Sequence, residues 1–147
     1  MILLDTNILV HAAGIKSPQH ARAKELRDRA ASGEIQGCIA AQVLAEFYAI
    51  MTDPRRFQPP LAPAHVRRDL QSYLSSRLWL ILPKETTVSR MLNLLGPRPV
   101  RGGKIFDLLL AATMLDNGVG TIYTENVRDF EGLDGVEAIN PFVPEHS

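Results

Sequence analysis

The first seven residues of the chain, Met1-Ile2-Leu3-Leu4-Asp5-Thr6-Asn7, place a short apolar run directly before a carboxylate, a hydroxyl and an amide. Buried strands of parallel sheets read as continuous apolar runs, and ligands bind just beyond their carboxyl ends. The stretch therefore predicts a central strand over residues 2–4, with Asp5 as the first polar group at the mouth of a crevice. Residues of this type also cap helices, so the alternative is that one of the three only caps a helix that starts near Ile8.

The composition is that of an ordinary globular domain. The 147 residues are 46% hydrophobic and 22% charged, with 16 basic and 16 acidic side chains, so net charge gives no argument for a nucleic-acid partner. The length predicts one domain over residues 1–147, with a loose tail at 143–147. Cys38 is the only cysteine, which excludes an internal disulfide and favours a buried packing role. No signal-peptide pattern and no apolar stretch of about 18 residues is found, so a cytoplasmic location without membrane contact is expected.

Short apolar runs alternate with longer helical patterns along the chain. Strands are expected at residues 2–4, 35–39, 78–82 and 121–123, with a last one at 136–139, and helices are expected between them. This alternation predicts an α/β fold with a mostly parallel sheet. In such a fold the carboxyl ends of the strands and the adjacent helix N-termini meet on one edge.

Acidic and polar side chains recur at that expected edge. Asp5 follows the first strand, Glu46 lies on the helix after the second, and Asp107 opens the apolar helix before the fourth. Each has an ordinary alternative: Glu46 as a surface residue that reaches water or an arginine, and Asp107 as a partner of the helix dipole, worth ~0.3–1 kcal/mol. A half-buried Glu46 that points into a site is the functional interpretation. A further polar group follows the fourth strand and comprises Thr124, Asn126 and Asp129.

Several carboxylates in one partly buried site repel one another unless a cation joins them. Oxygen ligands favour a hard ion, Mg²⁺ or Mn²⁺, over zinc. The four histidines show no metal-ligand spacing, and a lone cysteine cannot build a thiolate site. A metal-activated water in such a site is a suitable nucleophile for phosphodiester hydrolysis.

Residues 96–104 form a loop with three cations and no acid, namely Arg98, Arg101 and Lys104. Basic side chains beside flexible glycines suit contacts to a phosphate backbone. Short basic loops are also common as plain solvated surface, and both interpretations stay open.

Together, Asp5-Thr6-Asn7 after an N-terminal strand, Glu46, Asp107 and the stretch Thr124-Glu125-Asn126-Val127-Arg128-Asp129-Phe130 resemble a PIN-domain ribonuclease. The length resembles the VapC-type toxins of toxin–antitoxin (VapBC) pairs. The resemblance implies a three-layer PIN-like fold, with a four- to five-stranded sheet flanked by helices. It also implies a metal-dependent endoribonuclease, usually a homodimer, that cleaves structured RNA such as tRNA or rRNA and is inhibited by a cognate VapB-type antitoxin.

The resemblance also assigns roles to residues. Acids matching Asp5, Glu46 and Asp107 surround Mg²⁺ or Mn²⁺, and Glu46 either ligates the ion or takes a proton from the attacking water. A fourth acid often follows the fourth strand. Asn126 stands where an aspartate is frequent, and the acid nearby, Asp129, matches a frequent family position and is counted with Asp5, Glu46 and Asp107 among the catalytic residues. Hydrogen bonds that orient the acids are assigned to four polar residues: Thr6, Asn7, Thr124 and Asn126.

Two other protein classes that carry an aspartate after the first strand lack their further required residues in this chain. Aspartyl-phosphate phosphatases need a second aspartate two residues after the first, where this chain has Asn7, and a receiver domain needs an acceptor aspartate after the third strand, where it has Leu82-Pro83-Lys84. A catalytically silent PIN-fold binding module and a non-toxin PIN nuclease remain as alternatives.

Overall fold

The computed structural model describes residues 1–144 and contains one sheet of five parallel strands in the order β3-β2-β1-β4-β5. The strands are β1 (Ile2–Leu4), β2 (Gly37–Ala40), β3 (Trp79–Ile81), β4 (Thr121–Tyr123) and β5 (Glu137–Ile139). The predicted α/β class and parallel sheet are thus confirmed. Residues 145–147 of the predicted tail lie outside the described residues, and Phe142 just before that tail packs edge-on against His11.

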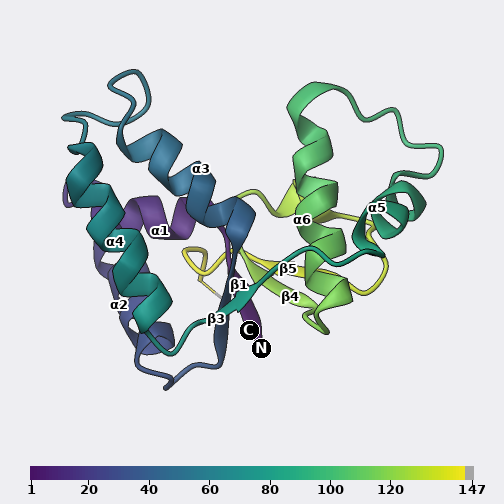
Figure 1. The fold of residues 1–147 in the computed structure, drawn as a ribbon, viewed down its shortest axis with the longest axis horizontal. Helices are drawn as coiled ribbons and strands as arrows, with labels where there is room; N and C mark the ends of the chain where they lie inside the picture. Colours follow the sequence, from purple (N-terminus) through teal and green to yellow (C-terminus); the bar gives the residue numbers. More distant parts are fainter. Residues whose placement is uncertain (145–147) are drawn as a thin grey trace.

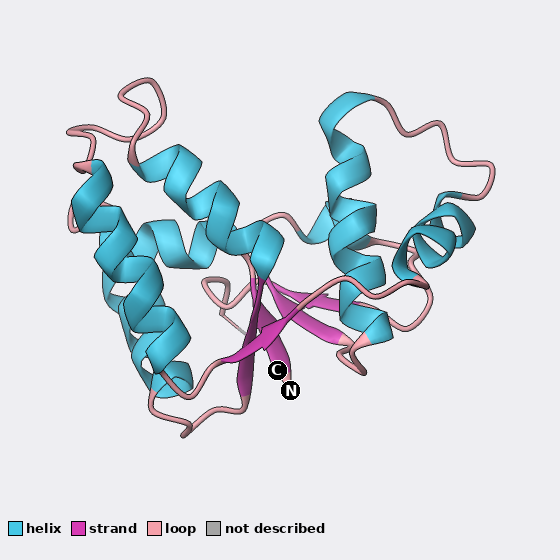
Figure 2. Cartoon of the chain, viewed as in Figure 1, coloured by secondary structure: helices cyan, strands magenta, loops and turns pink. Residues whose placement is uncertain are grey.

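Six α-helices and two short 3₁₀ helices connect the strands. The α-helices are α1 (Thr6–Ala13), α2 (His20–Ala31), α3 (Ala41–Met51), α4 (Pro63–Ser75), α5 (Thr87–Leu95) and α6 (Ile105–Asp116). The 3₁₀ helices are η1 (Gly102–Lys104), which ends the predicted basic loop, and η2 (Val127–Phe130). Helices α1–α4 form one group and α5 and α6 another, with the sheet between them (Figures 1 and 2). The predicted three-layer arrangement is therefore present.

The chain reverses direction across the sheet beside β1. From β1 it proceeds outward to β2 and β3, and from β3 it returns to β4, on the other side of β1. The two halves carry their helices on opposite faces of the sheet (Figure 1). A reversal of this kind leaves a crevice beyond the carboxyl ends of the two central strands. Here those strands are β1 and β4, and their last residues, Leu4 and Tyr123, are partners in the ladder.

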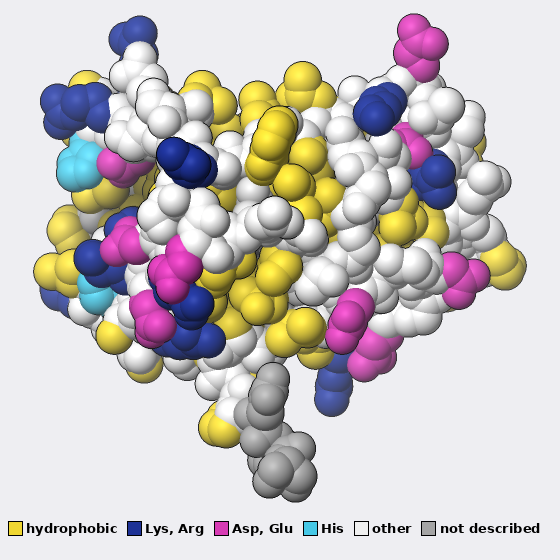
Figure 3. All heavy atoms as spheres, turned by 90° about the horizontal axis from the view of Figure 1, so that it is seen from below, with side chains coloured by type: hydrophobic (Ala, Val, Ile, Leu, Met, Phe, Trp, Pro, Cys, Tyr) yellow, Lys and Arg dark blue, Asp and Glu magenta, His cyan; other side chains and the backbone are white. Residues whose placement is uncertain are grey.

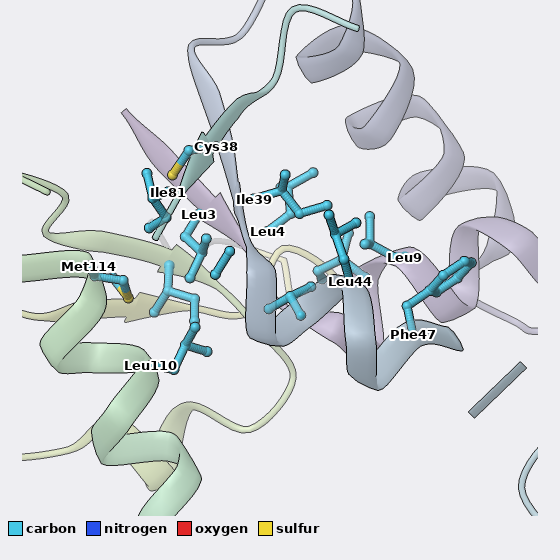
Figure 4. Packing of buried hydrophobic residues seen from close by; sticks show 14 of the residues in the cluster. Leu3, Leu4, Leu9, Cys38, Ile39, Leu44, Phe47, Ile81, Leu110 and Met114 are labelled. Carbon is cyan, nitrogen blue, oxygen red and sulfur yellow. The ribbon is translucent and has the colours of Figure 1, made fainter. Parts of the chain in front are cut away.

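The hydrophobic core fills both sides of the sheet. Figure 4 shows Leu9, Leu44 and Phe47 on the side of α1 and α3, and Leu110 and Met114 of α6 on the other. The central strands supply Leu3, Leu4, Cys38 and Ile39, all at most 1% exposed. Because burial raises the pKa of the Cys38 thiol to about 12, Cys38 is a packing residue, as predicted.

The edge strand β3 is far more exposed than the centre of the sheet. Trp79 and Leu80 of the strand, and Leu82 just after it, are each more than 40% exposed. Figure 3 shows hydrophobic side chains gathered in the middle of the lower face of the molecule, with charged side chains on its flanks. Within the described residues, no helix is both long enough and apolar enough to cross a membrane.

Candidate active site

Asp5 lies where β1 ends and α1 begins, at the crevice between β1 and β4. Its backbone N–H donates to the carbonyl of Tyr123 at 3.0 Å, which extends the β1–β4 ladder by one residue. One carboxylate oxygen, Oδ1, accepts from the Thr6 N–H at 2.7 Å and so caps α1. The other, Oδ2, accepts from the Thr124 hydroxyl at 2.7 Å. The sequence left two roles open for a polar residue here, a helix cap and a polar group at the crevice. Asp5 has both roles, one through each carboxylate oxygen.

A hydrogen-bond network holds Asp5 in place. Thr124, fully buried after β4, accepts from the Asn7 amide at 3.1 Å and from the Asn126 N–H at 3.0 Å while it donates to Asp5. The Asn7 amide nitrogen also lies 3.4 Å from Asp5 Oδ2, and the Asn7 oxygen accepts from the Glu125 N–H at 3.2 Å. The network ties the β4–η2 turn to the start of α1 and fixes the direction of the carboxylate.

Thr6 and Asn126 contribute to this network through backbone groups. The buried Thr6 hydroxyl makes no hydrogen bond within residues 1–144, and it is the Thr6 N–H that orients Asp5. Thr6 thus hydrogen-bonds to Asp5 in the way expected of an orienting residue, and it does so through its backbone N–H and not through its hydroxyl.

The predicted acids meet at a cavity of about 520 Å³ between α1, α3 and α6. Glu46 of α3 and Asp107 in the first turn of α6 line it together with Asp5. Asn126 lines it as well, whereas Asp129 does not belong to its wall. The sequence interpretation of a half-buried Glu46 is wrong, since the residue is exposed, but it does face the site because it lies on the side of α3 that borders the cavity.

Burial and mutual repulsion perturb the acids of this cavity. Burial raises the pKa of Asp107 to about 6, and the negative charges of Asp129, Asp5 and Glu46 add to the effect. Burial also raises the pKa of Asp5, against the opposing hydrogen bonds from Thr124 and Thr6. Carboxylates that raise one another's pKa form a site that a bound cation stabilises.

Asp129 acts on the site from a short distance. It lies on η2, and its charge is the first of the three that raise the pKa of Asp107. The Lys104 ammonium lies 3.9 Å from the Asp129 carboxylate and partly offsets its negative charge. Asp129 and Asn126 thus occupy different places, one beside the cavity and one in its wall.

The donor set suits a hard divalent cation held partly through water. The side chains that interact electrostatically with Asp107 at the cavity, Asp5, Glu46 and Asp129, offer carboxylate oxygens. Carboxylate oxygen is the ligand type preferred by Mg²⁺ and Mn²⁺. Within residues 1–144, no three His, Cys, Asp or Glu side chains lie close enough to enclose an ion directly. Mg²⁺ keeps several of its waters and binds through one or two carboxylates, so Asp5 and Asp107 would hold such an ion, and Glu46 lines the same cavity.

The predicted basic loop is largely engaged in contacts within the protein. Arg98 donates to the backbone carbonyls of Gly132 at 2.6 Å and Glu131 at 3.4 Å, so it braces the loop against the segment after η2. Lys104 is paired with Asp129. Of the three predicted RNA contacts, Arg101 is the only one with no ion pair or side-chain hydrogen bond in the part of the chain that the structure describes.

Two residues of the cavity wall, His11 and Gln42, were missed at the sequence level. His11 Nε2 lies 2.7 Å from the Glu125 carboxylate and Nδ1 lies 2.5 Å from the Ser17 hydroxyl. Gln42 donates to the carbonyl of Phe106 at 2.9 Å and so joins α3 to the first turn of α6. Helical spacing is the signal that identifies both, because His11 lies four residues after Asn7 and Gln42 four before Glu46.

Comparison with known proteins agrees with this geometry. A family model described as PIN domain matches residues 2–136. Ribonuclease VapC24 of Mycobacterium tuberculosis is 28% identical over 131 residues, which cover 88% of this chain and 89% of the relative. Among solved structures, the sarcin–ricin loop cleaving toxin VapC20 of M. tuberculosis has a TM-score of 0.66 at 16% identity and covers 92% of this chain and 98% of its own. VapBC2 of Rickettsia felis, bound to a promoter DNA fragment, has a TM-score of 0.65 at 23% identity, with 95% and 98% covered.

The two structural likenesses span almost the whole of each chain and therefore concern the entire fold. The family model covers β1 through the segment before β5, and thus Asp5, Glu46, Asp107 and Asn126. The chain therefore belongs to the PIN-domain family.

Proposed function

We propose that the chain is a metal-dependent endoribonuclease that acts as the toxin of a toxin–antitoxin pair. The observation that carries the proposal is the convergence of Asp5, Glu46 and Asp107, from three separate elements, on one cavity at the β1–β4 crevice. The raised pKa of Asp107 supports a role in binding a cation. The similarity to Ribonuclease VapC24 supports RNA as the substrate.

The residues divide the reaction between them. A bound Mg²⁺ or Mn²⁺ would supply Lewis-acid activation of water and of the phosphodiester. Asp5 and Asp107 would hold the ion, directly or through water, and the Thr124 and Asn7 network keeps the Asp5 carboxylate turned toward the cavity. Glu46, exposed at the wall, either joins them or accepts a proton from the attacking water at its carboxylate. Asp129 adds negative charge beside Asp107.

The partners belong to the same proposal. Solved structures of similar fold are toxin–antitoxin complexes, among them VapBC2, which supports a VapB-type antitoxin as the inhibitor of this chain. VapC20, of the same fold, cleaves the sarcin–ricin loop, which supports structured RNA, tRNA or rRNA, as the target here. The exposed apolar side chains of β3 support self-association as a homodimer. A cytoplasmic location is part of the proposal, supported by the buried, unpaired Cys38.

The direct test is cleavage of total RNA by the purified protein with Mg²⁺, Mn²⁺ or EDTA, compared with Asp5→Asn. The matched control is Asp134→Asn, which removes an exposed carboxylate away from the cavity. Cleavage that requires metal, is lost in Asp5→Asn and persists in Asp134→Asn is the expected result. Equal background in every lane from folded protein that also fails to bind Mn²⁺ by calorimetry would contradict the nuclease and favour the silent binding module, whereas Mn²⁺ binding without bulk cleavage would indicate a narrowly selective RNA target.

A further inference from the structure

We propose that the RNA backbone is bound by a surface on α3, α4 and the loop between them, made of Tyr48, Arg56, Arg67 and Arg68; we call it the α3–α4 surface. The inference rests on the proposed nuclease function and names the route of its substrate. It replaces the basic loop at residues 96–104 as the main phosphate contact.

Among the residues that the structure describes, Arg56 is the one Lys or Arg side chain in the wall of the cavity that the acids line. It is exposed, lies on the loop between α3 and α4, and lines the same cavity as Asp5, Glu46 and Asp107. The one acid of that loop, Asp53, is paired with Arg55 at 3.2 Å. Within residues 1–144 the Arg56 side chain makes no ion pair or hydrogen bond, so its guanidinium is available to a phosphate at the edge of the cavity.

A second cavity, between α3 and α4, is also lined by arginines. Its volume is about 600 Å³, and Arg67, Arg68 and the half-exposed Tyr48 line it with no acidic residue in its wall. Neither arginine has an ion pair or a side-chain hydrogen bond among the described residues. The nearby Asp69 carboxylate lies instead 3.7 Å from His65. Two exposed guanidiniums beside an aromatic face offer both phosphate contacts and a stacking platform for a base.

The outer side of α3 connects the two cavities. With about 100° between successive residues of a helix, Ala49, Ala45 and Tyr48 follow Glu46 in turn around the exposed side. All four are exposed. A strand that leaves the carboxylates beside Arg56 therefore crosses α3 over two alanines before it reaches Tyr48. No large side chain of α3 blocks this path.

The charge balance favours this surface over the basic loop. Three arginines of the α3–α4 surface are without an internal partner among residues 1–144, against Arg101 alone in the loop at 96–104, because Arg98 braces Gly132 and Lys104 pairs with Asp129. Each cation that neutralises a phosphate of a single strand contributes about 0.7 to the slope of log K against log salt. The two surfaces thus make different quantitative predictions.

The test measures salt-dependent binding of a fluorescein-labelled single-stranded oligouridylate by anisotropy, in EDTA, with Asp5→Asn as the parent so that the probe stays intact. Combined Arg56→Ala, Arg67→Ala and Arg68→Ala should reduce the slope by about 2. The same three changes to Lys should keep the slope, which separates charge from folding. Tyr48→Ala should weaken binding about tenfold at an unchanged slope, since a base that stacks on the aromatic ring adds affinity without neutralising a phosphate. The matched control, Arg98→Ala with Arg101→Ala and Lys104→Ala, should reduce the slope by about 0.7 at most.

An unchanged slope in the α3–α4 triple variant, with its thermal melt intact, would overturn the inference. The same result with a smaller particle mass by light scattering would also overturn it and assign the surface to contact between two copies of the chain. Failure of the nuclease itself is recognised separately, as absence of Mn²⁺-dependent cleavage by the wild-type protein with Asp5 intact.

Discussion

Replacing Asp107 by Asn should stabilise the metal-free protein while it abolishes cleavage. Asp107 accepts no side-chain hydrogen bond in the described part of the chain, and its pKa is about 6 because of burial and of the charges of Asp129, Asp5 and Glu46. In the unfolded chain the pKa of Asp returns to near 3.8. The folded state therefore disfavours the ionised form of Asp107, and the neutral amide removes that cost.

The magnitude follows from this shift of about 2 pH units. At 1.36 kcal/mol per unit, the ceiling is about 3 kcal/mol. Asp107 is only partly buried, so solvent screening reduces the effect to about 2 kcal/mol. Loss of the favourable contact with the N-terminus of α6 subtracts ~0.3–1 kcal/mol. Repulsion thus outweighs the helix dipole, and a net gain of about 1 kcal/mol, or about 2–4 °C in Tm, is expected at about pH 7.5.

The linkage between protonation and folding fixes how the stability contributed by Asp107 changes with pH. Since the folded-state pKa is raised, wild-type stability from this group is fully present below about pH 3.8 and is lost as the pH rises through about 6. The advantage of Asp107→Asn should therefore grow across that window and be absent at its acidic end. Urea unfolding in EDTA at several pH values measures it. Excess Mn²⁺ should then stabilise the wild type and leave the variant unchanged.

Asp116, the last residue of the same helix, is the matched control with the opposite sign. Hydrogen bonds from the Thr87 hydroxyl and the Arg90 guanidinium lower the pKa of Asp116. Its contribution to stability is present above the unfolded pKa and is lost as the pH falls through the lowered one. Asp116→Asn should destabilise the protein near pH 7.5. An Asp107→Asn variant that is no more stable than the wild type in EDTA would refute the reasoning.

Three further changes test the network, the open ligand position and the brace. Thr124→Val should leave the fold intact but weaken Mn²⁺ binding and cleavage about 10–100-fold, because the bond to Asp5 is lost; calorimetry and kinetics measure it, and Thr124→Ser should restore both. Asn126→Asp places a fourth acid in the cavity wall, so the Kd for Mn²⁺ should fall several-fold while metal-free stability falls as well; unchanged Mn²⁺ affinity would remove this position from the site. Arg98→Ala should cost about 0.5–1 kcal/mol in urea unfolding, because the exposed carbonyl of Gly132 exchanges its donor for water, with oligouridylate binding unchanged; a weaker complex would return Arg98 to the RNA surface.

The local sequence pattern predicted most of the active-site residues. An apolar run that ends in Asp5-Thr6-Asn7 predicts a strand, a turn and a helix from residues adjacent in the chain, and the strand–helix alternation predicts which edge gathers Asp5, Glu46 and Asp107. These inferences hold because strand ends and helix starts are set by short-range apolar periodicity and capping.

Hydrogen-bond partners that lie far apart in the sequence could be identified only from the tertiary structure. The hydroxyl of Thr124 reaches Asp5 across 119 positions of the chain, and Arg98 is diverted to the carbonyl of Gly132. Neither pairing has a local signal, because strand order decides which turns become neighbours. The sequence does not distinguish an arginine that hydrogen-bonds to a neighbouring loop from one that faces solvent. Only the folded structure shows that Arg98 does the first and Arg56 the second.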